Sequence, residues 1–126
     1  MASSDWKRWC RGHADIALDG DDVVVTFIGG RHHRVEVVDA GEAYELTGLV
    51  ARPVALQSVP NAHLRAWERN RATQLVGFRV DRRGRLVGNA WAPKPGMGAD
   101  EFLHYVRRVA SECDRFEFIL TGKDYE

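Results

Sequence analysis

The sequence is short of the residues and runs that define several specialised classes of protein. It holds two cysteines, Cys10 and Cys113, which are too few for a disulfide framework and lack the CxxC spacing of zinc and redox sites. No apolar run approaches the roughly 20 residues of a transmembrane helix. The first residues show no apolar segment typical of a secretory signal. We therefore expect reduced thiols, a cytoplasmic location and no contact with membranes.

A surplus of charge of either sign is also lacking. The 126 residues include 18 basic and 18 acidic side chains, so the formal net charge is zero. A neutral chain has no overall electrostatic attraction to nucleic acid or to an anionic membrane. The length fits one ordinary domain, and hydrophobic residues make up 44% of it, which suffices for a core without disulfides or metals. We expect a single domain over residues 1–126.

Patterns for catalysis and metal binding are missing as well. The five histidines are scattered, and the neighbours His32 and His33 should point to opposite faces of a strand. A zinc site instead needs converging ligands, often at short fixed spacing. The serines and cysteines stand in no recognisable nucleophile motif, and Cys113 lies on an apolar helical stripe that suits a core residue. We expect no enzymatic activity, no cofactor and no metal site.

Residues that favour β-structure predict five strands. Three of them, Val23–Ile28, His32–Val38 and Tyr44–Ala51, should form an antiparallel meander. Gly29-Gly30 is a two-residue hairpin signal between the first two, because glycine tolerates a positive φ. The other two, Leu75–Val80 and Leu86–Trp91, flank a turn at Asp81–Gly84 and predict a second hairpin.

Three helices complete the prediction. Short ones are expected over residues 2–11 and from an N-cap at Asn61 to about Arg71. The third follows a stripe whose members are spaced alternately by four and three: Phe102, Val106, Val109, Cys113, Phe116 and Leu120. A strand over Phe116–Leu120 is the rival, but no breaker interrupts the stripe. We therefore predict an α+β fold with a five-stranded antiparallel sheet, in the order α-β-β-β-α-β-β-α.

Six features of the second half are distinctive together: His63–Asn70, Val76–Asp81, the turn at Gly84, Leu86–Trp91, Gly98–Phe102 and Val109–Glu117. In these features the chain resembles the YbjN and type III secretion chaperone-like superfamily. The resemblance implies a type III secretion chaperone-like fold and a non-enzymatic, often dimeric protein. It also implies a chaperone-like or adaptor role, in which the domain holds an extended segment of a client protein.

The predicted sheet has more surface than its helices can cover, because one long helix and one short helix hide little more than one face. Apolar residues left over, and the two N-terminal tryptophans, are the expected partner-binding residues: Trp6, Trp9, Val23, Val25, Phe27, Val35 and Val37. Core packing is the alternative for the two tryptophans. A homodimer contact is expected on the second helix, through Leu64, Trp67 and Arg71.

Two other functions remain open. The segment Arg65–Arg85 carries seven arginines, and its second hairpin could contact the phosphates of a nucleic acid through Arg79, Arg82, Arg83 and Arg85. A solvated basic edge is the simpler interpretation of these arginines, and it is preferred. A small immunity-like or antitoxin-like inhibitor of a partner enzyme would use the same surface physics as a chaperone, with a different partner.

Overall fold

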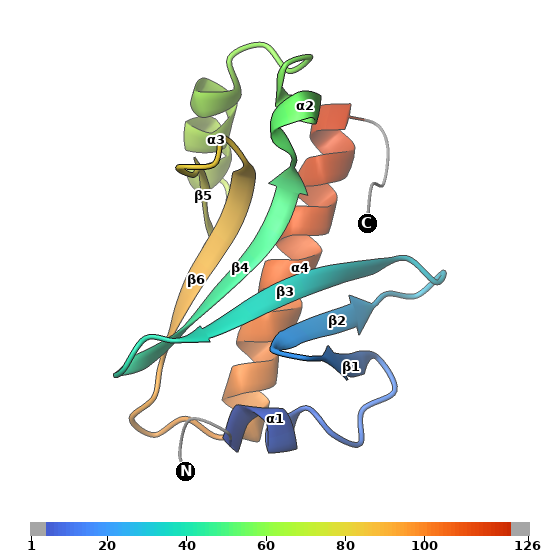
Figure 1. Cartoon of the computed structure of the whole chain (residues 1–126), viewed down its shortest axis with the longest axis vertical. Coiled ribbons are helices and arrows are strands. Elements are labelled where there is room, and N and C mark those ends of the chain that lie inside the picture. The colour runs from blue at the N-terminus through green and yellow to red at the C-terminus, as the bar shows by residue number, and fades with distance from the viewer. Residues whose placement is uncertain (1–4, 122–126) are drawn as a thin grey trace.

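The computed structural model describes residues 5–121, which form a long helix packed on an antiparallel sheet (Figure 1). The elements in chain order are α1 (Asp5–Trp9), β1 (Ile16–Asp19), β2 (Asp22–Thr26), β3 (His32–Asp39), β4 (Ala43–Ala51), α2 (Pro53–Leu56), α3 (Ala62–Asn70), β5 (Gly77–Val80), β6 (Leu86–Pro93) and α4 (Ala99–Thr121). The strands lie in the order β1-β2-β3-β4-β6-β5, and every neighbouring pair is antiparallel.

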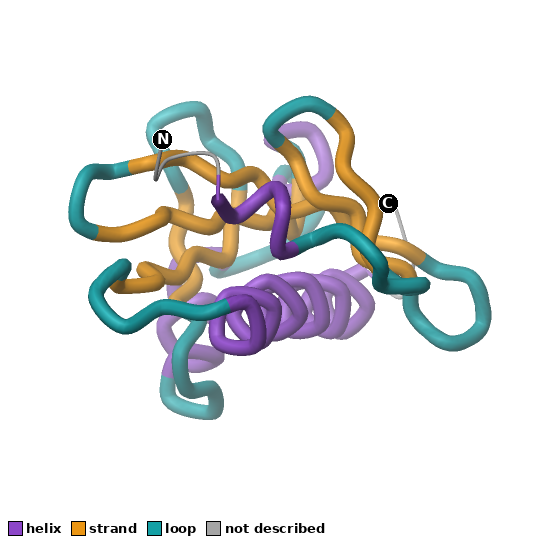
Figure 2. Tube along the Cα trace, turned by 90° about the horizontal axis from the view of Figure 1, so that it is seen from below, coloured by secondary structure: helices purple, strands orange, loops and turns teal. Residues whose placement is uncertain are grey.

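Helix α4 lies along one face of the sheet, as Figure 2 shows from the helix end. The predicted apolar stripe is the buried side of this helix: Phe102, Val106, Val109, Cys113 and Phe116 are each at most 2% exposed. This confirms the continuous helix and excludes the rival strand over Phe116–Leu120. Since α4 contacts strands of both halves of the chain, it joins the meander and the second hairpin into one core.

Two glycines bring α4 close to the sheet. Gly48 on β4 and Gly88 on β6 are register partners and both lie under Cys113. A Cβ atom at Gly48 would lie 2.8 Å from the Cys113 sulfur, and one at Gly88 would lie 2.4 Å from it. The space that glycine leaves is therefore occupied by the thiol, which confirms Cys113 as a core residue. Its burial raises the pKa of the thiol.

The sheet has six strands and not the five predicted. The missed strand is β1, a four-residue edge strand in which Ile16 alone is buried, so its sequence shows no alternation. Residues 19–22 form the β1–β2 turn, with Gly20 at a φ of 63°. A second missed element is the one-turn helix α2, which begins with Pro53 at its first position.

The two hairpins appear where glycine and charged turn residues predicted them. Gly29 and Gly30 have φ values of 101° and 92°, which confirms a turn at these glycines, but the connection runs over residues 27–31 and is longer than the two residues predicted. The strand before them is shorter than expected, because β2 ends at Thr26 and leaves Phe27 and Ile28 in the loop. Asn61 takes the N-cap position of α3 as expected, but with a φ of 57° and no capping hydrogen bond from its side chain.

No helix within the described range 5–121 has both the length and the apolar character needed to cross a bilayer.

Candidate functional site

The valines expected to receive a partner are core residues. Val23, Val25, Val35 and Val37 are at most 5% exposed and belong to the cluster beneath α4. Side chains alternate along a strand, so their neighbours Val24, Arg34, Glu36 and Val38 face the other, helix-free side. The expectation of a free valine face is therefore wrong, because the long helix covers the face that carries these valines.

The N-terminal tryptophans also pack inward. Trp6 is 4% exposed, and its ring centroid lies 5.8 Å from that of Phe102 at the start of α4. The ring of Trp9 is partly buried and lies 5.6 Å from the same phenylalanine. The alternative of a core-capping helix thus describes α1, and the tryptophans are not free for a partner in this conformation.

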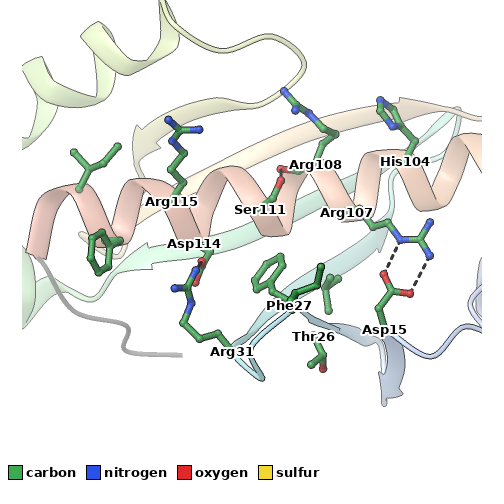
Figure 3. A pocket seen from close by; sticks show the side chains of 14 residues that line it. Asp15, Thr26, Phe27, Arg31, His104, Arg107, Arg108, Ser111, Asp114 and Arg115 are labelled. Carbon is green, nitrogen blue, oxygen red and sulfur yellow. Dashed lines mark hydrogen bonds and ion pairs between the residues drawn. The ribbon is translucent and has the colours of Figure 1, made fainter.

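Phe27 belongs instead to a groove between the β2–β3 loop and the outer side of α4 (Figure 3). The groove has a volume of about 850 Å³. Its apolar residues are Phe27 and Ile28 from the loop and Phe118 and Ile119 from the last turns of α4. Ile28 is fully exposed, while Phe118 and Ile119 are about half exposed. These are large apolar side chains that the fold itself does not bury.

The position of Phe118 follows from helix geometry. Successive residues of an α-helix turn by about 100°, so a residue two places after the buried Phe116 faces away from the sheet. Phe118 and Ile119 are not among the predicted site residues, although both are apolar residues off the predicted stripe. Apolar residues on the outer side of an otherwise amphipathic helix are the signal that would have found this groove.

Arginines surround the apolar residues of the groove. Figure 3 labels four of them, Arg31, Arg107, Arg108 and Arg115, against two aspartates, Asp15 and Asp114. Arg31 pairs with Asp114, and Arg108 pairs with Glu112 on the next turn. Arg115 is exposed, and within the described part of the chain it makes no ion pair. The lining of the groove therefore combines apolar side chains with four arginines and two aspartates.

A bidentate ion pair lies across one end of the groove. Arg107 donates from Nε and Nη2 to the two carboxylate oxygens of Asp15, at 2.9 Å and 3.0 Å. These hydrogen bonds hold the pKa of Asp15 below its usual value. The pair links α4 to the loop before β1, which lies beside the end of β2 on the side of the groove that faces α4.

The predicted dimer contact lies on the outer side of α3. Leu64 and Trp67 are 52% and 57% exposed, and the Arg71 guanidinium stacks over the Trp67 ring at 5.4 Å. The inner side of the helix is held by the buried Ala66. The structure therefore brings these three residues together on one surface, separate from the groove.

Of the four arginines proposed for nucleic acid, three are exposed and one is paired within the fold. Arg82 and Arg83 are exposed in the β5–β6 turn, and Arg79 is exposed on β5. Arg85 instead forms an ion pair with Asp81, at 2.8 Å. Burial raises the pKa of Asp81, but hydrogen bonds from the backbone of Arg85, the side chain of Arg85 and the backbone of Arg83 lower it overall. Part of the positive charge of this hairpin is thus neutralised within the fold.

Comparison with known proteins identifies the fold. No family model matches the sequence, and no curated protein matches it. A chain in the crystal structure of the ExsC–ExsE complex superposes with a TM-score of 0.61 at 13% identity, covering 95% of this chain and 96% of that one. A chain of the heterodimeric ExoU–SpcU complex, from the type III secretion system of Pseudomonas aeruginosa, superposes with a TM-score of 0.57 at 17% identity. That alignment covers 92% of this chain and 98% of the other. These likenesses confirm that the chain has a type III secretion chaperone-like fold.

Proposed function

We propose that this protein is a non-enzymatic, chaperone-like or adaptor domain that binds a segment of a partner protein in the groove beside α4. The observation that carries the proposal is the exposure of Ile28, Phe118 and Ile119 in a hollow that is lined by arginines. The two solved structures compared above, which share the fold, are complexes between two proteins, and this supports a partner for this chain too.

The chemistry of the groove specifies the kind of segment that fits it. Full burial of a large apolar side chain is worth about 1.5–3 kcal/mol, so a few apolar anchors in this groove supply most of the affinity. Arginines in the groove contribute mainly to specificity and to the rate of association. The partner segment should therefore combine apolar anchors with acidic side chains, which would approach Arg115 and Arg108.

We infer further that the chain belongs to the YbjN and type III secretion chaperone-like superfamily and acts in the cytoplasm. The resemblance of the second half and the fold together support the superfamily. The two cysteines are both buried and unpaired with each other, which suits a reducing compartment. We also propose a homodimer through α3, because Leu64 and Trp67 form an exposed apolar surface distinct from the groove.

The two other functions are less well supported. In a nucleic-acid interface at the β5–β6 hairpin, Arg85 would not be available for phosphates because it pairs with Asp81. The nearby Phe78 is buried, so it cannot stack on bases. Binding that falls steeply with salt on single- and double-stranded probes would favour it nonetheless. An inhibitor of a partner enzyme could use the same groove, and the identity of the bound protein would decide between inhibitor and chaperone.

The test is site-specific photo-crosslinking in the native cells. A photoreactive amino acid replaces Phe118 in the groove or Trp91, which is 55% exposed on β6 and lies outside it. We expect one protein to crosslink from position 118 and not from position 91, and to co-purify with this chain as a defined complex when the two are expressed together. Equal crosslinking from both positions, or none from 118, would contradict the groove as the binding site.

A further inference from the structure

Three side chains with metal-binding chemistry meet in the core between β3 and α4. They are His33, Asp114 and Glu117, each at most 5% exposed, and their ligand atoms all lie within 4.8 Å of one another. Strand alternation turns His33 inward while His32 points to solvent. Asp114 and Glu117 are three residues apart on α4, so they share one side of the helix.

The His33 ring carries its hydrogen on Nε2, which leaves Nδ1 able to bind a metal ion. Its Nε2 atom lies 2.7 Å from the carbonyl oxygen of Leu49, and because a carbonyl only accepts, Nε2 carries the hydrogen. In the neutral ring, Nδ1 then has a free lone pair. Metal-binding histidines typically donate their second ring N–H to a carboxylate or a backbone carbonyl in this way, which fixes the ring and its tautomer.

The Nδ1 atom is fully buried and has no hydrogen-bond partner. Buried polar atoms almost always have one, so this atom requires an explanation. Oδ1 of Asp114 lies 3.9 Å away, which is too long for a hydrogen bond. A cation between the two atoms would reach both, since zinc bonds to nitrogen and oxygen measure about 2.0–2.2 Å.

We propose that His33, Asp114 and Glu117 bind a zinc-class divalent cation, with Nδ1 and one oxygen of each carboxylate as ligands. Water would complete the tetrahedral coordination. Tetrahedral ligand atoms lie about 3.4 Å apart, so the carboxylates need to move inward by about 1 Å, which side-chain rotation provides. The imidazole ligand favours zinc over magnesium and calcium, which prefer oxygen alone.

Two of the three side chains border cavities of the protein. Asp114 lines the groove beside α4. Glu117 lines a separate cavity of about 490 Å³ near α2, whose other residues include Ser58 and Val54. The ion would join strand β3 to the C-terminal half of α4 and so stabilise the folded state by binding to it alone. This inference does not depend on the partner of the groove.

The test begins with protein freed of metal by a chelator, titrated with Zn²⁺ in a calorimeter near neutral pH. We expect one ion per chain, an increase in Tm, and no comparable response to Mg²⁺. His33→Gln should weaken zinc affinity at least about tenfold, because a ligand is lost. His32→Gln is the matched control on the outer side of the same strand and should bind as the parent does. Equal affinity of the parent and His33→Gln would overturn the proposal.

A second measurement covers the case in which His33→Gln fails to fold. Crystals of the parent protein soaked in Zn²⁺ should give an anomalous peak at the zinc edge between the three side chains. Peaks confined to exposed histidines such as His63 or His104, or no peak, would show an adventitious ion only and overturn the site. In that case Nδ1 is a buried atom without a ligand.

Discussion

Arg107 and Asp15 lie 92 residues apart in sequence and form a bidentate ion pair across one end of the groove. Their side chains are 41% and 39% exposed, so solvent weakens the pair and its contribution should be of the order of 0.2–1 kcal/mol. The pair nevertheless orients the guanidinium of Arg107 and connects the N-terminal loop to the helix that carries the core.

Acid titration should reveal this pair. The folded-state pKa of Asp15 is lowered below the ordinary 3.8, so its stabilisation is present above that value and is lost as the pH falls through the folded pKa. We expect the difference in unfolding free energy between the parent and Asp15→Asn to be constant near neutral pH and to shrink below about pH 4. Urea unfolding at a series of pH values measures it. A difference that grew in acid would contradict the assignment.

Substitutions in the groove should weaken binding of the partner without lowering the stability of the fold. Phe118→Asp and Ile119→Asp should weaken binding of the crosslinked partner at least about tenfold, because each removes an apolar anchor. Both side chains are half exposed, so Tm should change little. Trp91→Asp serves as a control outside the groove. Partner affinity that stays unchanged in both α4 variants would exclude the groove.

The dimer prediction is tested on α3. Trp67→Glu should shift the protein toward the monomer in sedimentation equilibrium, since a charge replaces an exposed aromatic residue at the proposed contact. Trp91→Glu removes an equally exposed tryptophan from the sheet and should leave self-association intact. If Trp91→Glu dissociates the dimer and Trp67→Glu does not, the contact lies on the helix-free face of the sheet.

The close approach of α4 to the sheet predicts a steric effect. Gly48→Ala should destabilise the fold by about 1–3 kcal/mol, because its Cβ would lie 2.8 Å from the Cys113 sulfur. The double variant with Cys113→Ala should recover part of that loss. Gly77→Ala, where nothing lies within 4 Å of the added Cβ, is the control and should be nearly neutral. Purely additive effects of Gly48→Ala and Cys113→Ala would show that the sulfur is not what the methyl group meets.

The regular spacing of apolar residues made the long helix predictable from the sequence. The sequence did not show which face of the sheet this helix covers, and so the partner-binding residues were predicted less well. The stripe from Phe102 to Phe116 identified α4 because one face of a long helix must meet the core. The four-residue β1 has a single buried side chain, so nothing in its sequence distinguishes it from a loop. Alternation showed that the valines of β2 and β3 share a face, but the sequence does not state which face the helix covers.

The location of the candidate site depends on which face of the sheet α4 covers. Once α4 is placed over the valines, the surface available to a partner moves to its outer side, where Phe118 and Ile119 lie. His33 and its two carboxylate neighbours are far apart in sequence and meet only because α4 crosses β3 at one particular register. No spacing rule for metal ligands describes such a meeting.

The burial of Cys113 makes alkylation of its thiol a measure of how often α4 separates from the sheet. Alkylating reagents are attacked by the thiolate, and this sulfur is buried against Gly48 and Gly88 with a raised pKa. Alkylation at this position therefore requires that α4 first separate from the sheet. The rate of labelling measures how often the helix detaches, and a partner or an ion that holds α4 in place would slow that rate.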